Sequence, residues 1–187
     1  LFETIVIVFL FTTMSFAQGQ ILTENISIKD GLSNNTIRDI IQDKYGYLWV
    51  ATADGINIYD GYKISILKNI PNDSTSLPSN VTYRIYEDRA GVIWISTDDG
   101  LARYNRDSNN FTTFYPSEST AELANQTIHL YEDRKNNFWI NTSEGVLQFD
   151  RDSETFKRYD VMVLDNSVMR FVNYGGAIIE SSNENLY

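Results

Sequence analysis

Three polar side chains of different chemistry, Asp39, Arg84 and His129, stand 45 residues apart in the sequence. Each falls within a short run that alternates between apolar and polar residues as a β-strand does. A carboxylate, a guanidinium and an imidazole on neighbouring strands would offer charge and hydrogen-bonding groups to a small polar ligand. We therefore take this column as the candidate ligand-binding site. The simpler alternative is that these side chains are only solvated at the wall of a channel.

Patterns typical of catalysis or metal binding are missing from the sequence. It contains no nucleophile–base pair, no phosphate-binding glycine loop and no cluster of metal ligands. The acidic pairs Glu87-Asp88 and Asp98-Asp99 could suggest calcium binding or acid–base chemistry. They fall at turn positions of a repeat, which favours solvated turn carboxylates. We expect no catalytic residue, no metal and no cofactor in this chain.

The elements that position the polar column belong to a repeat of 45 residues. Residues 34–60, 79–105 and 124–150 align without a gap, and Trp49, Trp94 and Trp139 occupy the same place in each. A fixed period of this size is the signature of a repeat architecture. The predicted repeats span about 31–75, 76–120 and 121–165, followed by an incomplete fourth at 166–187.

Each repeat contains four strand-like runs separated by turn signals. Asp-Gly or Glu-Gly marks one turn in every repeat, and its glycines are Gly55, Gly100 and Gly145. Four antiparallel strands in 45 residues are typical of a β-propeller blade. The sequence thus predicts an all-β partial propeller of about three and a half blades, with the polar column on the innermost strands. In the first repeat the expected strands are Ile37–Gln42, Leu48–Thr52, Ile56–Tyr59 and Lys63–Leu67.

The columns that repeat without change are interpreted as structural. The three tryptophans are expected to pack between neighbouring blades, where a large ring buries the face that a single sheet would expose. The aspartates that follow the first strand of each repeat are expected to accept hydrogen bonds from backbone N–H groups of the next turn. These aspartates are Asp43, Asp88 and Asp133.

Composition narrows the class of partner. The formal net charge of -10 argues against binding nucleic acid or an anionic membrane surface, which requires excess Lys and Arg. Residues 1–17 carry an apolar run and a small-x-small motif at Ser15-Phe16-Ala17, which predicts a secretory signal peptide and an exported protein. A buried strand is the alternative for this segment.

The repeat resembles that of the two-component regulator propeller family. The opening of that pattern matches Leu32-Ser33-Asn34-Asn35 and Leu77-Pro78-Ser79-Asn80; its middle matches Glu87-Asp88, Gly91, Trp94 and Thr97; its end matches Gly100-Leu101, Tyr104-Asn105 and Phe111. The third repeat departs from the pattern with Asn136 at the turn glycine and Ala124 in place of serine.

The resemblance implies the periplasmic sensor region of a membrane-anchored hybrid histidine kinase, in the manner of gut Bacteroidetes. It further implies a homodimeric full-length protein, a kinase region elsewhere, and an oligosaccharide or another small ligand. Two other classes stay open: a propeller enzyme of the lyase or quinone-dependent dehydrogenase type, and a non-catalytic interaction scaffold. We also expect Ile26–Lys29 to form an outer strand, and further blades to complete the ring.

Overall fold

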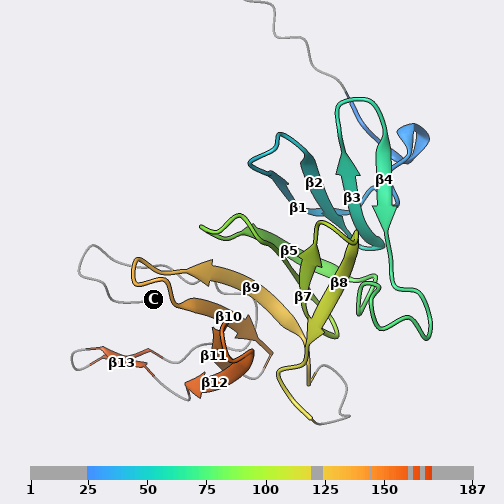
Figure 1. Ribbon diagram of the computed structural model, residues 1–187. Coiled ribbons are helices and arrows are strands. Elements are labelled where there is room, and N and C mark those ends of the chain that lie inside the picture. Colours follow the sequence, from blue (N-terminus) through green and yellow to red (C-terminus); the bar gives the residue numbers. More distant parts are fainter. Residues whose placement is uncertain (1–24, 119–123, 144, 160–161, 165–166, 170–187) are drawn as a thin grey trace, which may run out of the picture.

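The computed structural model describes residues 25–118, 124–143, 145–159, 162–164 and 167–169, and within them it is built almost entirely of antiparallel strands. Three four-stranded sheets follow one another along the chain, each with consecutive strands paired (Figure 1). The predicted all-β propeller architecture is confirmed. Blade 1 comprises β1 (Ile37–Gln42), β2 (Leu48–Thr52), β3 (Gly55–Tyr59) and β4 (Ile64–Leu67). Blade 2 comprises β5 (Thr82–Glu87), β6 (Ile93–Thr97), β7 (Gly100–Asn105) and β8 (Asn110–Phe114). Blade 3 comprises β9 (Thr127–Glu132), β10 (Phe138–Thr142), β11 (Gly145–Asp150) and β12 (Thr155–Tyr159), and a separate hairpin pairs β13 (Met162–Leu164) with β14 (Ser167–Met169).

The four strands predicted in the first repeat are present with bounds that agree to within one residue. The glycine turns also behave as expected, because Gly55 has a φ of 99° and Gly100 a φ of 115°, a region that side chains rarely adopt. At Gly55 a Cβ atom would in addition lie 2.6 Å from the carbonyl oxygen of Leu67. The turn therefore requires glycine both for its backbone conformation and for the close approach of β4.

The blades are stacked so that β1, β5 and β9 lie next to one another as the innermost strands (Figure 1). Apolar side chains fill the space between successive blades. One side of each interface, here called the tryptophan face, carries Trp49, Ala51 and Ile56 in blade 1 and Trp94, Leu101 and Phe114 in blade 2. The opposite side, here called the receiving face, carries Ile85, Ile93, Ile95, Tyr104 and Phe111 in blade 2 and Leu130, Phe138, Ile140, Phe149 and Phe156 in blade 3.

The tryptophans pack between blades as predicted. The ring of Trp49 meets the ring of Tyr104 of the next blade edge-on, with 4.9 Å between centroids. Trp94 contacts Phe149 of blade 3 in the same manner at 5.6 Å. Both tryptophans are only 1% exposed. Because each blade covers the tryptophan of its predecessor, the stability of one blade depends on the presence of the next.

One predicted element is wrong. Ile26–Lys29 was expected as an outer strand, but a short 3-10 helix, η1 (Ile28–Asp30), occupies this segment. Ser27 and Asp30 form a capping box that satisfies the local backbone groups, and Gly31 closes the turn in the left-handed region. Local hydrogen bonds therefore replace the sheet pairing that a strand would have needed.

Two predictions fall outside the described residues, namely the signal peptide at 1–17 and most of the incomplete fourth repeat at 166–187. In the described part of the chain, no helix combines the length and the apolar character needed to cross a membrane.

Candidate functional site

The polar column predicted from the sequence forms a continuous row across the three innermost strands. Arg84 on β5 lies between the other two members: its Nε donates a hydrogen bond to His129 Nδ1 at 3.3 Å, and its Nη1 lies 3.7 Å from Asp39 Oδ1. Asp39 also ties its strand to the next, because its Oδ2 accepts the backbone N–H of Ile85 at 2.9 Å. The Arg84 side chain is 41% exposed and thus accessible to a ligand. We call these three residues the inner row.

The contact between Arg84 and His129 defines the protonation of the imidazole. A guanidinium can only donate, so His129 Nδ1 must accept and carries no proton in this arrangement. The imidazole is therefore neutral, with its proton on Nε2. His129 lies within β9, as the sequence indicated. The inner row thus combines a carboxylate, a guanidinium and a neutral imidazole at one place on the molecule.

A second group of polar residues lies beside the inner row and was not predicted. The register of β1 against β2 shifts between Ile37 and Asp39, and that of β5 against β6 shifts between Thr82 and Arg84. Each shift is a β-bulge that leaves one extra residue, Arg38 or Tyr83, out of the ladder. Bulges re-aim side chains and often occur next to functional sites.

The bulge residues bring three blades together through polar contacts. The guanidinium carbon of Arg38 lies 4.6 Å from the centre of the Tyr83 ring. The Tyr83 hydroxyl donates to Asp98, and the Gln126 amide donates to both, at 2.8 Å to the hydroxyl and 2.9 Å to Asp98 Oδ1. Burial, together with the hydrogen bond and charge of Asp98, raises the pKa of Tyr83, and Arg38 opposes this rise. We call Arg38, Tyr83, Asp98 and Gln126 the bulge cluster.

The bulge cluster corrects the interpretation of two acidic pairs. Asp98 is half-buried and bonded to Tyr83 and Gln126, so it is not a solvated turn carboxylate. Asp88 is 5% exposed and accepts hydrogen bonds from Trp94 Nε1 and the backbone of Val92. Their turn positions were recognised correctly, but solvation was not, because burial depends on the neighbouring blade.

The repeated aspartates perform the predicted turn role and a second one. Asp43 Oδ1 accepts the backbone N–H groups of Tyr45 and Tyr47, and its Oδ2 accepts Trp49 Nε1 at 2.9 Å. The same aspartate–tryptophan bond recurs at 2.9 Å in blades 2 and 3. Burial alone would raise the pKa of Asp43, but the bonds from Trp49, Arg106 and the backbone hold it below its usual value. These residues are structural, as predicted.

An arginine from the following blade completes each internal aspartate. Arg106 Nη2 donates to Asp43 Oδ2 at 2.8 Å, and Arg151 Nη1 donates to Asp88 Oδ2 at 3.1 Å. We call this pairing the arginine clasp. Arg106 and Arg151 are 45 residues apart, so the repeat contained the signal, although the pairing across blades could not be read from it.

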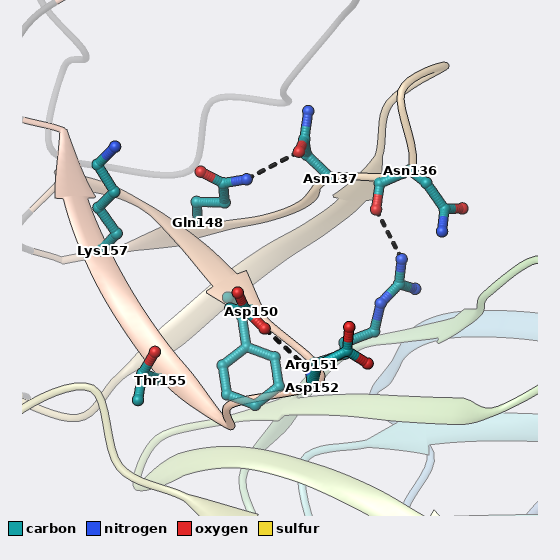
Figure 2. Close-up of a pocket in the computed structure, with 9 residues that line it drawn as sticks. Asn136, Asn137, Gln148, Asp150, Arg151, Asp152, Thr155 and Lys157 are labelled. Carbon is teal, nitrogen blue, oxygen red and sulfur yellow. Dashed lines mark hydrogen bonds between the residues drawn. The ribbon is translucent and has the colours of Figure 1, made fainter.

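The larger surface grooves lie at the blade boundaries and not at the inner row. Figure 2 shows a polar groove of about 370 Å3 beside blade 3, lined by side chains that include Gln148, Asp150 and Lys157. Within it, the Gln148 amide donates to Asn137 Oδ1 at 2.8 Å, and Arg151 donates to the carbonyl of Asn136 at 2.7 Å.

A groove of about 400 Å3 occupies the equivalent place beside blade 1. Ile58, Asp60 and Ser65 stand there in the columns of Gln148, Asp150 and Lys157, and Tyr104 and Arg106 of blade 2 close its far side. Because both grooves recur with the repeat, we interpret them as boundaries between blades.

The comparisons with known proteins agree with this geometry. The two component regulator propeller family matches residues 31–54 and 76–99, which contain the two inner strand pairs of blades 1 and 2. The chain contains two-component regulator propeller repeats. These two repeats include Asp39 and Arg84 of the inner row and both bulged strands. Blade 3 has the same strand order and the same register shift, so it extends the series.

A sequence relative of these repeats is histidine kinase P4 of Formosa agariphila, which is 40% identical over 76 residues. The match covers 41% of this chain and only 6% of the kinase.

Solved structures share the fold of the two-component regulator propeller repeats. The extracellular domain assigned to a hybrid two component system of B. thetaiotaomicron has a TM-score of 0.69 at 24% identity, covering 87% of this chain and 28% of that one. A second extracellular domain from the same organism, assigned to a one component system, has a TM-score of 0.67 at 20% identity, covering 90% and 22%. A streptogramin B lyase has a TM-score of 0.58 at 18% identity, covering 83% and 48%. At these identities the likeness concerns the fold alone.

Proposed function

We propose that these blades form part of a periplasmic propeller that binds a small polar ligand at the inner row and relays its presence to a histidine kinase. The observation that carries the proposal is the inner row itself. Three side chains from three blades are joined in one array, although their column does not repeat in type and is not needed to rebuild the blade. The family match and the relatedness to histidine kinase P4 support the signalling context.

The chemistry of the array favours recognition over catalysis. Arg84 is tied to a carboxylate and a neutral imidazole, an arrangement that presents several donors and acceptors together. The bulge cluster adds a hydroxyl, an amide, a carboxylate and a guanidinium nearby. A ligand rich in hydroxyl groups, such as an oligosaccharide, suits such a mixed surface, which is why we propose this class and assign no catalytic role.

Binding is tested by thermal unfolding of the purified protein with a panel of neutral and acidic oligosaccharides, followed by calorimetric titration of any hit. A ligand at 100 times its dissociation constant should stabilise the protein by about 2.7 kcal/mol. Arg84→Ala should weaken binding at least tenfold, since hydrogen bonds to a charged group contribute about 1.5–3 kcal/mol. Arg103→Ala is the matched control, because Arg103 lies on β7 and pairs with Glu154 away from the inner row. Equal loss of affinity in both variants, or binding by none of the panel, would contradict the proposal.

A further inference from the structure

Blade 1 displays an apolar surface on the side that faces away from blade 2. Ile40 is 57% exposed there, whereas Ile85 and Leu130, which hold the same column in blades 2 and 3, are 4% and 9% exposed. The surface includes a shallow apolar groove of about 140 Å3. The N-terminal residues Ile26 and Leu32 form one of its walls and leave Ile40 open. Its other walls include Ile40, Leu48, Val50, Tyr59 and Ile64.

This surface is a receiving face by every column. The strand pairings place Leu48, Val50 and Ile64 where blade 2 has Ile93, Ile95 and Phe111. In blade 2 these positions pack against the tryptophan face of blade 1, and in blade 3 their equivalents pack against that of blade 2. We propose that this surface docks a further blade of the same polypeptide, which presents its tryptophan face. The two interfaces already described are the argument, because this surface continues their pattern.

The proposed seam differs from the internal interfaces in its polar contacts. Blade 2 contacts blade 1 through the clasp of Arg106 and through Glu87, whose carboxylate accepts the backbone N–H of Lys44 at 3.0 Å. The corresponding positions of blade 1 are Gly61 and Gln42. Glycine carries no guanidinium, and the Gln42 amide donates to the carbonyl of Gly46 in its own turn. Blade 1 therefore brings no arginine clasp and no carboxylate to the blade it receives.

The missing clasp restricts the chemistry of the docked blade. The buried aspartate of its turn must find a second donor within its own blade, since an incompletely bonded buried carboxylate is costly. Blade 3 shows how this is done: Asn137 Nδ2 donates to Asp133 Oδ2 at 2.8 Å, beside the bond from Trp139. We infer that the docked blade carries its tryptophan with an asparagine in the column of Asn137, or lacks the buried aspartate.

Thiol reactivity in the complete gene product tests the seam. These 187 residues contain no cysteine, so in a cysteine-free background each introduced thiol is unique. Ile40→Cys reports on the proposed seam, Ile85→Cys on a described buried interface, and Ile66→Cys on an outer strand position that is 44% exposed. We expect the thiol at position 40 to react with a maleimide at least tenfold more slowly than the thiol at position 66, and at a rate close to that of the thiol at position 85. Equal rates at positions 40 and 66 would overturn the proposal.

Two further results identify the occupant. Protection of the thiol at position 40 that persists on dilution supports a blade of the same polypeptide, whereas protection lost on dilution means that a second copy covers the face and overturns the proposal. Protection lost when residues 1–24 are removed means that the N-terminal segment is the cover, and overturns it as well. Gln42→Glu should slow the labelling of the Ile40→Cys variant roughly tenfold more, since the carboxylate can accept a backbone N–H as Glu87 does. No change with this second substitution would contradict the proposed orientation.

Discussion

Replacing Arg151 with methionine should destabilise the protein by about 2–4 kcal/mol, because two buried carboxylates would lose their common cation. Arg151 Nη1 donates to Asp88 Oδ2 at 3.1 Å, and its Nη2 donates to Glu132 Oε1 at 2.7 Å. The side chains of Asp88 and Glu132 are only 2% and 1% exposed. Methionine keeps an apolar stem near the ring of Phe138, which the guanidinium now covers at 5.4 Å. The substitution therefore isolates the loss of charge and hydrogen bonds.

The magnitude follows from what each carboxylate retains. Breaking a buried pair costs about 3–5 kcal/mol when one charge is left without compensation. Here Asp88 keeps its bonds from Trp94 and Val92, and Arg151 itself is 20% exposed, so the lower part of that range applies. Lys68→Met is the control: the ion pair of Lys68 with Asp54 has side chains 39% and 37% exposed, and its removal should cost no more than about 1 kcal/mol.

Urea unfolding followed by tryptophan fluorescence is the assay, since Trp49 and Trp94 report on the two blade interfaces. The midpoint should fall in the Arg151 variant with an unchanged denaturant slope. If the free energies of unfolding of the two variants agree within about 0.5 kcal/mol, the arginine clasp does not stabilise the stack, and the reasoning from burial fails.

Three further predictions concern stability. Trp94→Ala should cost about 3–5 kcal/mol, the range for truncating a buried large aromatic residue, while Arg84→Ala should cost under about 1 kcal/mol; equal melting temperatures would contradict the assignment of the two columns. Gly55→Ala should destabilise by more than about 1 kcal/mol in the same urea assay, because φ is 99° and a carbonyl oxygen lies where the methyl group must go; a neutral effect would refute the turn geometry. The pKa values of Asp43 and Asp133 are lowered in the fold, so their contribution is present above the ordinary value of 3.8 and is lost as the pH falls below it. Thermal unfolding between pH 6 and pH 3 checks this, and a melting temperature that rises on acidification would contradict it.

The strands and turns were predictable because their signals are local. Alternation of apolar residues and the glycine at Gly55 define β2 and β3 without reference to any neighbour. The repeat then transfers the assignment to the other blades. The inner row was predictable for a related reason: once the first strand of each repeat is placed innermost, Asp39, Arg84 and His129 must be neighbours.

The features that escaped prediction depend on contacts between blades. A bulge at Arg38 or Tyr83 exists only relative to a paired strand, so the sequence alone does not reveal it. The burial of Asp88 and its clasp by Arg151 likewise require the next blade to be in position. Ile26–Lys29 was misassigned because its β-like composition hid a capping box that is satisfied locally.

The central claim is that the inner row binds the ligand, and the only histidine among these 187 residues offers a direct test. Heteronuclear NMR of the His129 imidazole should first show the neutral tautomer protonated at Nε2, as the bond from Arg84 requires. On titration with the bound oligosaccharide, the imidazole signals should shift and saturate with the dissociation constant measured by calorimetry. A ligand that binds while the His129 signals stay unchanged would contradict the account.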